Sequence, residues 1–236
     1  MSYLTNMLWG KYEGAAGNQG YVYIKATNPQ LNDIYMLYFH GINGDAIRAI
    51  TRMDKIGCHK FFIEYPGYSF ISRSTDLTTI TLGEDTDTIL KEIFEQIPSK
   101  ATVIMYGRSI GTGIMCPKIE PYTQRIQGII LETPFISLPE LIKTYAGFIG
   151  VVVGNWFEIY KWDLSTLDHI KNTTTKVLIL GCGQDYITPI SHSHLLFENL
   201  KSSPDIQLTI LENESHQLKF QKIEEDVMEW LTTKFL

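Results

Sequence analysis

Ser109 is the residue whose type and neighbours best suit covalent catalysis. It lies in Gly107-Arg108-Ser109-Ile110-Gly111, between an apolar run at 102–106 and a glycine-rich run at 111–116 that favours a helix. A serine at the tip of so tight a turn has a strained backbone, and the flanking glycines remove side chains that would clash. The hydroxyl is then exposed near the positive end of a helix. The spacing predicts a nucleophile elbow, and a purely structural turn is the alternative.

The residues that would activate this serine occur later in the chain. A serine nucleophile needs a histidine to take its proton and a carboxylate to orient that histidine. Asp185 directly follows a predicted strand at 177–180, and His216 directly follows another at 206–211. Both are therefore expected at the carboxyl ends of parallel strands, where open α/β sheets build their sites. Because the chain order also fits this kind of elbow, we predict a Ser109, Asp185, His216 triad.

Other polar residues compete for these roles. Glu132 is the alternative acid, because it too ends a predicted strand, whereas His40 is expected to shape its loop by hydrogen bonding. His192 and His194 alternate at a predicted helix start, but we can assign no further carboxylate or thiolate to a metal site there. We therefore predict no metal and no cofactor. The remaining candidates are expected to be surface or interface histidines and capping aspartates: His59, His169, Asp163 and Asp168.

Attack on a carbonyl group also requires preformed N–H donors for the oxygen that becomes negative. The backbone of Ile110, the residue after the nucleophile, should supply one donor. The other should come from the segment 40–44, which follows a predicted strand at 34–39. Within it we choose Ile42 as the donor, with Gly41 letting the backbone approach the substrate. A plain glycine turn is the alternative for this segment.

The elements that must hold these residues alternate between strands and helices, which predicts an α/β fold with a mostly parallel central sheet and helices on both faces. We expect a single domain over 1–236, and the period-two pattern of 21–26 indicates an antiparallel strand at the edge. The predicted strands are 21–26, 34–39, 60–65, 102–106, 126–132, 176–181 and 206–211, and the predicted helices lie within 45–56, 83–97, 191–200 and 220–234.

Composition is that of a globular protein able to bury a large core. The chain has 236 residues, 44% of them hydrophobic and 19% charged. A formal net charge of −6, with no cluster of lysine and arginine, argues against nucleic acid as a partner. Three cysteines, Cys58, Cys116 and Cys182, lie in or beside predicted core elements. Buried, reduced thiols are typical of a reducing compartment, so we expect a cytoplasmic protein.

Membrane-targeting signals are not expected either. The first residues have neither the basic segment nor the apolar core of a secretory signal, and position 2 is serine, which excludes N-myristoylation. The Phe235-Leu236 end has no prenylation cysteine. The most apolar stretch, 146–154, is about half of the roughly twenty residues that span a bilayer. We expect no transmembrane segment and a soluble, intracellular protein.

Several segments together resemble the α/β-hydrolase-domain-containing serine hydrolases. Residues 38–45 are similar to the oxyanion loop of that family, and 64–69 to its Asp-Tyr-x-Gly-Tyr-Gly segment. Residues 106–112 look like the elbow of the branch that contains protein depalmitoylases. Residues 180–189 and Ser215-His216 resemble its acid and histidine loops. The resemblance covers nearly the whole chain from about Ile34 onward, and it implies an α/β-hydrolase fold and a serine hydrolase activity.

The chain departs from this family at three places. Ile42 follows His-Gly where the family often has asparagine, and Ser215 precedes the histidine where glycine is common. The cysteine-rich, lipidated N-terminus that anchors some relatives is not expected here. Peripheral membrane contact and the oligomeric state stay open.

The segment from about 135 to 170 is a candidate short cap over the site. It is rich in apolar side chains, among which Phe148 and Trp156 are candidate contacts for an acyl chain. A helix packed on the core is the alternative for this segment. We expect a hydrolase that cleaves carboxylic esters or thioesters of a small-molecule or acylated substrate through an acyl-serine. A serine peptidase or amidase of the same fold, or a non-catalytic interaction protein, is the alternative.

Overall fold

Short apolar runs form most of the strands, as the sequence predicts. The computed structural model describes residues 7–14, 17–42, 44–65, 79–145, 164–200 and 203–236. The chain groups into two units that interleave along the sequence: the first contains 1–105, 125–127 and 219–236, and the second contains 106–124 and 128–218. Strands β5 (Thr102–Arg108) and β6 (Ile126–Glu132) therefore have residues in both units. The prediction of one domain over the whole chain stays a prediction.

The first unit contains four paired strands in the order β1-β2-β4-β3, with β3 parallel to β4 and the other pairs antiparallel. The predicted edge strand is antiparallel, but its place at the edge is wrong, since β1 pairs with its outer side from Met7↔Ile24 to Gly14↔Gly17. The sequence analysis did not predict β1, because Gly10 interrupts its apolar residues. The four strands are β1 (Met7–Gly14), β2 (Gly17–Ile24), β3 (Ile34–Phe39) and β4 (His59–Glu64).

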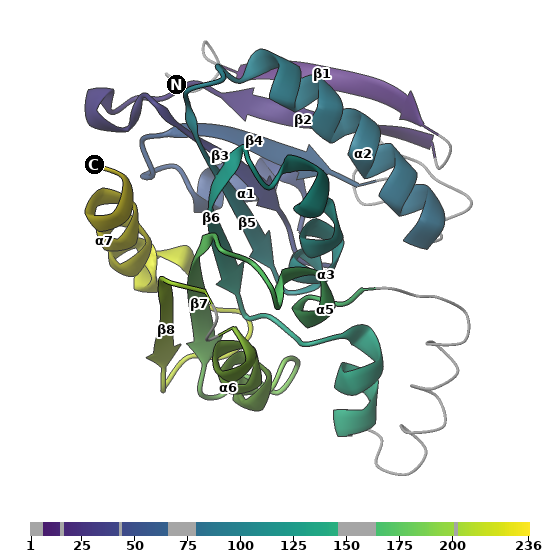
Figure 1. Ribbon diagram of the computed structural model, residues 1–236, viewed down its shortest axis with the longest axis vertical. Coiled ribbons are helices and arrows are strands. Elements are labelled where there is room, and N and C mark those ends of the chain that lie inside the picture. Colours follow the sequence, from purple (N-terminus) through teal and green to yellow (C-terminus); the bar gives the residue numbers. More distant parts are fainter. Residues whose placement is uncertain (1–6, 15–16, 43, 66–78, 146–163, 201–202) are drawn as a thin grey trace. The chain divides into compact units, whose positions relative to one another are not determined.

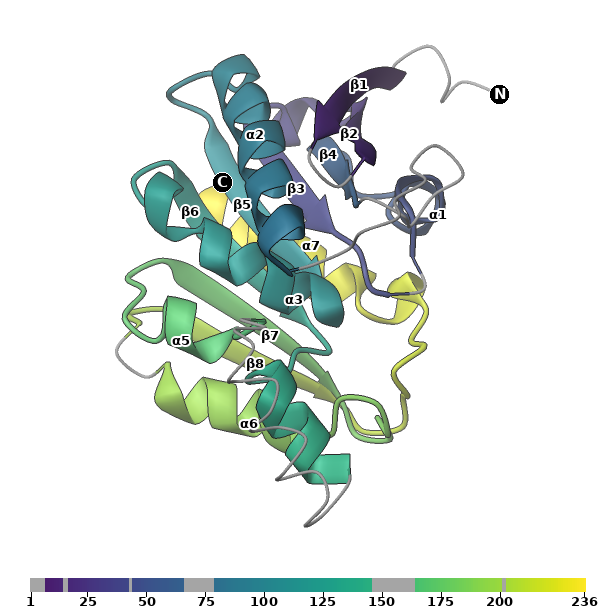
Figure 2. The ribbon, with the colours of Figure 1, turned by 90° about the vertical axis from the view of Figure 1, so that its right-hand side faces the viewer.

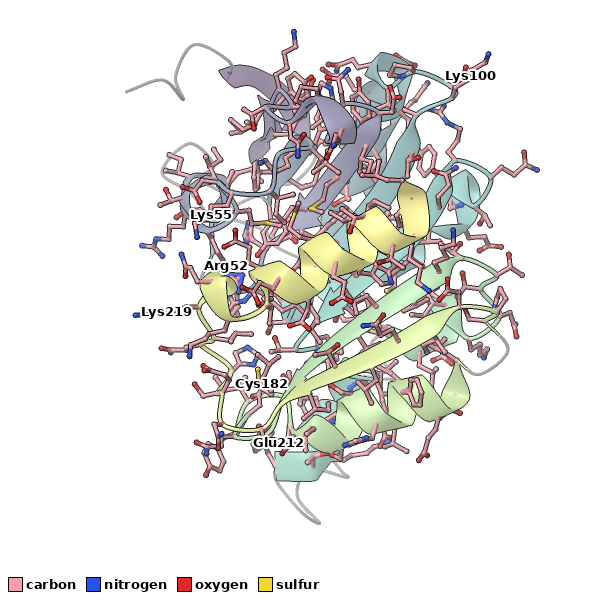
Figure 3. The ribbon with its side chains drawn as sticks, turned by 90° about the vertical axis from the view of Figure 1, so that its left-hand side faces the viewer. Arg52, Lys55, Lys100, Cys182, Glu212 and Lys219 are labelled. Carbon is pink, nitrogen blue, oxygen red and sulfur yellow. The ribbon has the colours of Figure 1, made fainter. Side chains whose placement is uncertain are left out.

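Helices of the first unit are seen on opposite sides of its strands. Helix α2 (Thr79–Gln96) is in front of them in Figure 2, and α7 (Glu224–Phe235) is in front in Figure 3, which looks from the other side. Helix α2 begins four residues before the predicted start at Gly83, because a glycine inside a helix costs only about 1 kcal/mol and does not end it. The other helical segments are η2 (Pro29–Leu31), α1 (Ala46–Arg52) and η5 (Phe220–Lys222).

The second unit is built on parallel strands. β6 pairs with β7 (Lys176–Cys182), and β7 pairs with β8 (Ile206–Leu211), each in parallel register. Helix α6 (Ile190–Asn199) packs on β7 and β8 (Figure 1). The carboxyl ends of these two strands are marked by Cys182 and Glu212 in Figure 3. The remaining helical segments are α3 (Ile110–Met115), η3 (Cys116–Lys118), η4 (Glu120–Tyr122) and α5 (Leu167–Ile170).

Alternation of parallel strands with helices confirms the predicted α/β class. Burial explains the composition of the strands, because nearly every residue of β4, β5, β6 and β7 is buried and so reads as a continuous apolar run. Within the candidate cap, residues 138–145 are helical, and Ser137 forms an isolated bridge with Ser165. Residues 146–163 of that segment, with Phe148, Trp156 and Asp163, lie outside the described residues.

Candidate active site

Ser109 occupies the turn between β5 and α3 with an unusual backbone. Its φ is 52° and its ψ is −123°, a region that costs a residue with a side chain about 1–3 kcal/mol. Gly107 is required beside it, because a Cβ there would lie 2.8 Å from the Cα and 2.9 Å from the backbone nitrogen of Thr112. The hydroxyl of Thr112 donates to the carbonyl of Ser109 over 2.8 Å. The predicted strand–turn–helix is therefore present, and the hydrogen bond from Thr112 stabilises its strained backbone.

A chain of hydrogen bonds joins Ser109 to the two residues predicted to activate it. The Oγ of Ser109 lies 2.9 Å from Nε2 of His216, and Nδ1 of His216 lies 2.8 Å from Oδ2 of Asp185. The three residues belong to the second unit, follow strands β5, β7 and β8, and are largely buried. This arrangement has the reach that proton transfer from the hydroxyl to the imidazole needs.

Asp185 is surrounded by donors that favour its charged form. The backbone N–H groups of Ile187 and Thr188 each donate to Oδ1 over 2.8 Å, and the hydroxyl of Thr188 lies 2.8 Å from Oδ2. Burial alone would raise the pKa of Asp185, but the hydrogen bonds from His216 and these neighbours outweigh it and hold the pKa below its ordinary value. Asp185 is thus an ionised acceptor for the imidazole at neutral pH.

Thr188 is a site residue that the sequence analysis missed. Its hydroxyl lies 3.1 Å from Nδ1 of His216 and 3.0 Å from the carbonyl oxygen of Thr133, as well as close to Asp185. The hydroxyl has one proton to donate, and the carboxylate of Asp185 and the carbonyl of Thr133 share it as acceptors. The available signal was its position three residues after Asp185, where an aspartate side chain commonly caps the following turn.

Glu132, the alternative acid, is bound elsewhere. Its Oε2 accepts from the hydroxyl of Tyr106 over 2.8 Å, and its Oε1 accepts from Nε of Arg108 over 3.0 Å. Its backbone carbonyl also accepts from the N–H of Ser109 over 2.9 Å. Asp185 therefore occupies the position beside the imidazole that the sequence left open between the two carboxylates.

The two predicted oxyanion donors lie in different units. Ile110 is the first residue of α3, where backbone N–H groups have no partner within the helix. Ile42 follows β3 in the first unit, and the residue is 57% exposed. Their role as donors stays a prediction.

Of the other histidines, His40 behaves as expected, with Nδ1 2.8 Å from the carbonyl oxygen of Gly41. The prediction of a surface or interface position for His59 is wrong. Its ring is buried and stacks on Tyr35 at a centroid distance of 4.2 Å and on Tyr23 at 5.7 Å. Its sequence position at the start of β4 carried no sign of these aromatic neighbours, which come from β2 and β3.

The described residues contain neither a metal-binding cluster nor a membrane-spanning helix. Within the described ranges, no three or more side chains of the histidine, cysteine, aspartate and glutamate types are grouped closely enough to hold a metal ion. In that part of the chain, no helix combines the length and apolar character that crossing a membrane requires.

Comparison with known proteins identifies the fold. No protein-family model matches the sequence. Over 184 residues the chain is 28% identical to Protein bem46 of Schizosaccharomyces pombe, a match that covers 75% of this chain and 59% of that protein. The chain thus spans less than two thirds of the length of this relative.

Three solved structures share the fold at low sequence identity. An esterase of Pyrococcus furiosus matches with a TM-score of 0.72 at 13% identity, covering 100% of this chain and 92% of that one. Est1E of Butyrivibrio proteoclasticus, with ferulic acid bound, matches at 0.71 and 15% identity, covering 92% and 96%. Mouse alpha/beta hydrolase domain-containing protein 10 matches at 0.67 and 13%, covering 96% and 98%. The chain therefore has the α/β-hydrolase fold.

Proposed function

We propose that this chain is a serine hydrolase that cleaves a carboxylic ester or thioester through an acyl-serine intermediate. The observation that carries the proposal is the continuous hydrogen-bonded chain of Ser109, His216 and Asp185, with 2.9 Å and 2.8 Å between successive partners. A serine in a strained turn, a histidine within reach of its hydroxyl and an ionised carboxylate behind the histidine are the parts that acyl transfer needs.

In the proposed acylation step, Oγ of Ser109 attacks the substrate carbonyl carbon while Nε2 of His216 takes the hydroxyl proton. Asp185 keeps the imidazole in the tautomer that has its proton on Nδ1 and stabilises the imidazolium that forms. The tetrahedral intermediate then expels the alcohol or thiol, which leaves with the proton from Nε2. Water attacks the acyl-serine in the second half of the reaction, again with His216 as the base.

Negative charge on the carbonyl oxygen needs two N–H donors. We propose the backbone N–H of Ile110 as one of them, because the first N–H groups of α3 have no partner within the helix. We propose the backbone of Ile42 as the second, on the sequence pattern alone. Phe148 and Trp156 are the proposed contacts of the acyl chain, on the same basis.

Two further considerations support an ester substrate and an intracellular setting. The fold neighbour from Pyrococcus furiosus is named an esterase, which favours esters over amides as the first substrates to test. Cys58, Cys116 and Cys182 are free and buried, so we propose a cytoplasmic location, in keeping with a reducing environment.

A fluorophosphonate probe and an ester panel test the proposal together. The wild-type chain should be labelled once and should hydrolyse p-nitrophenyl esters and matched thioesters faster than the corresponding p-nitroanilides. Ser109→Ala should abolish labelling and lower the rate by on the order of a millionfold. Ser203→Ala is the matched control, because Ser203 is buried and donates its hydroxyl to the carbonyl of Thr175 over 2.9 Å. Equal labelling of Ser109→Ala would exclude Ser109 as the nucleophile, and faster cleavage of the anilides would make the protein an amidase.

A further inference from the structure

Arg108 makes a second connection to the histidine, through its backbone rather than through its ring. Its Nε donates to Oε1 of Glu132 over 3.0 Å, and its Nη2 donates to the backbone carbonyl of His216 over 3.0 Å. The Arg108 side chain is 17% exposed and that of Glu132 is fully buried. One guanidinium therefore joins the end of β6 to His216, which lies 108 positions after Arg108 in the chain.

Glu132 is itself held from two sides. The hydroxyl of Tyr106 donates to its Oε2 over 2.8 Å, and its backbone carbonyl accepts from the N–H of Ser109 over 2.9 Å. The same residue thus fixes the backbone of Ser109 through its main chain and fixes Arg108 through its side chain. Arg108 in turn holds the backbone of His216 through its hydrogen bond to the carbonyl of that residue.

We propose that Arg108 is a positioning residue that sets where the imidazole of His216 lies relative to Ser109. This inference rests on the proposed function, since it gives Arg108 a role in the same reaction. Arg108 acts through the main chain of His216 and does not touch the reacting atoms. A base displaced by about 1 Å can cost a reaction on the order of a hundredfold in rate, so a fixed backbone at His216 has catalytic value.

The side-chain type fits this role. A planar guanidinium offers N–H groups in several fixed directions, so one arginine can hold a carboxylate and a carbonyl at the same time. Lysine keeps the positive charge but has a single flexible ammonium group, which cannot reproduce that geometry. Removing Arg108 alone would also leave the buried carboxylate of Glu132 without its cationic partner, which is strongly destabilising in itself. The test must therefore separate positioning from folding.

The kinetic test compares Arg108→Met, Arg108→Lys and the double variant Arg108→Met/Glu132→Gln, which removes the buried charge together with its partner. Arg125→Met is the matched control, because Arg125 also donates Nη2 to a backbone carbonyl, that of Ile97, over 3.1 Å, within the first unit. Rates are expressed per active site titrated with the fluorophosphonate probe, so that unfolded protein does not count.

If Arg108 positions the imidazole, its loss should lower kcat and leave KM nearly unchanged. Arg108→Met should lower kcat per titrated site by about 10- to 100-fold with KM changed less than about threefold, and Arg108→Lys should recover part of the loss. The double variant should regain stability but not kcat. Arg125→Met should keep the wild-type kcat. If kcat per site stays within about twofold of the wild type in Arg108→Met or in the double variant, the proposal is overturned.

A spectroscopic test does not depend on hydrolysis. The proton on Nδ1 of His216 should give a downfield NMR signal, assigned by its loss in His216→Gln. That signal should be shifted or broadened away in Arg108→Met and in the double variant, and kept in Arg125→Met. An unchanged signal in both Arg108 variants overturns the positioning role. If the wild type neither reacts with the probe nor cleaves esters, the proposed function fails, and this comparison alone still decides whether Arg108 positions the imidazole.

Discussion

The backbone N–H of Ser109 donates to the carbonyl of Glu132 over 2.9 Å, so the strained turn after β5 is fastened to the last residue of β6. The next residue, Thr133, has a φ of 45°, and its N–H donates to the carbonyl of Leu180 over 2.8 Å. One hydrogen bond therefore links two non-glycine residues with positive φ: Ser109 donates it, and Thr133 directly follows the residue that accepts it. Such strained backbone persists only where surrounding contacts hold it in place, and these two hydrogen bonds are such contacts.

Thr133→Gly should stabilise the protein. A β-branched residue at positive φ is strained by about 1–3 kcal/mol, whereas glycine adopts that backbone freely at an entropic cost of about 0.5–1 kcal/mol. The buried hydroxyl of Thr133 also has no hydrogen-bond partner among the described residues. We expect a net gain of about 1 kcal/mol in the free energy of unfolding, measured by urea denaturation. Thr133→Val is the control, since it removes the hydroxyl but keeps the strain, and a valine variant more stable than the glycine variant would contradict the strain argument.

The two carboxylates near the site should behave differently. Asp185→Asn should leave the fold intact but lower kcat by about 10⁴-fold, because an amide favours the wrong imidazole tautomer. Glu132→Gln should cost far less, because Glu132 contacts Tyr106 and Arg108 rather than the imidazole. Steady-state kinetics with circular dichroism on both variants checks this. The reverse ranking would make Glu132 the acid.

Gly107→Ala should damage the elbow more than a nearby glycine substitution does. The added Cβ would meet the backbone of Thr112 at 2.8 Å and 2.9 Å, and backbone atoms cannot move away cheaply. At Gly113 the nearest atom is the ring end of Phe135, at 2.9 Å, which can shift. We expect Gly107→Ala to cost about 1–3 kcal/mol in unfolding free energy and to lose probe labelling. Equal costs at the two glycines would contradict the backbone clash.

Protonated Glu64 should make the free energy of unfolding fall as the pH rises from about 4.5 to 7. Burial raises the pKa of Glu64 to about 7, although the N–H of Ala46 donates to its Oε2 over 2.9 Å; Asp45 adds to the rise. Nε2 of His40 also faces it, at 3.8 Å. The folded state then keeps a proton that the unfolded state releases above about pH 4.5, so unfolding free energy should drop by about 1–3 kcal/mol between pH 4.5 and 7.

Glu64→Gln should remove that part of the pH dependence, as followed by urea denaturation at a series of pH values. His40→Gln serves as the control for the neighbouring imidazole. The same slope in Glu64→Gln as in the wild type would show that another group binds the proton.

Acyl-chain length should affect the rate if Phe148 and Trp156 contact the substrate. Each buried methylene contributes at most about 0.8 kcal/mol, so kcat/KM should rise roughly threefold per carbon until the available space is filled. Trp156→Ala and Phe148→Ala should flatten this slope in a series of p-nitrophenyl esters. A maximum at acetyl that neither substitution changes would make both aromatics part of the core.

Much of this fold could be predicted from sequence because its strands are short, apolar and bounded by turn residues. The triad candidates could be chosen because each follows the end of a predicted strand. Each strand end can be predicted from its own local sequence. Arg108, Thr188 and His59 were not predictable in the same way, because their roles depend on side chains from elements far apart in the chain. Strand β1 lacked a clear apolar alternation and is defined by its pairing with β2.

The buried cysteines give each unit its own unfolding reporter. Burial raises the pKa of Cys58 to about 11 and that of Cys182 to about 12, and it raises the pKa of Cys116 as well. Because the thiolate is the form that reacts with iodoacetamide, these thiols should be alkylated only when the surrounding structure opens. Cys58 lies in the first unit, and Cys116 and Cys182 lie in the second. Mass spectrometry of alkylated peptides can therefore time the opening of the two units separately, in every variant and without introducing new cysteines.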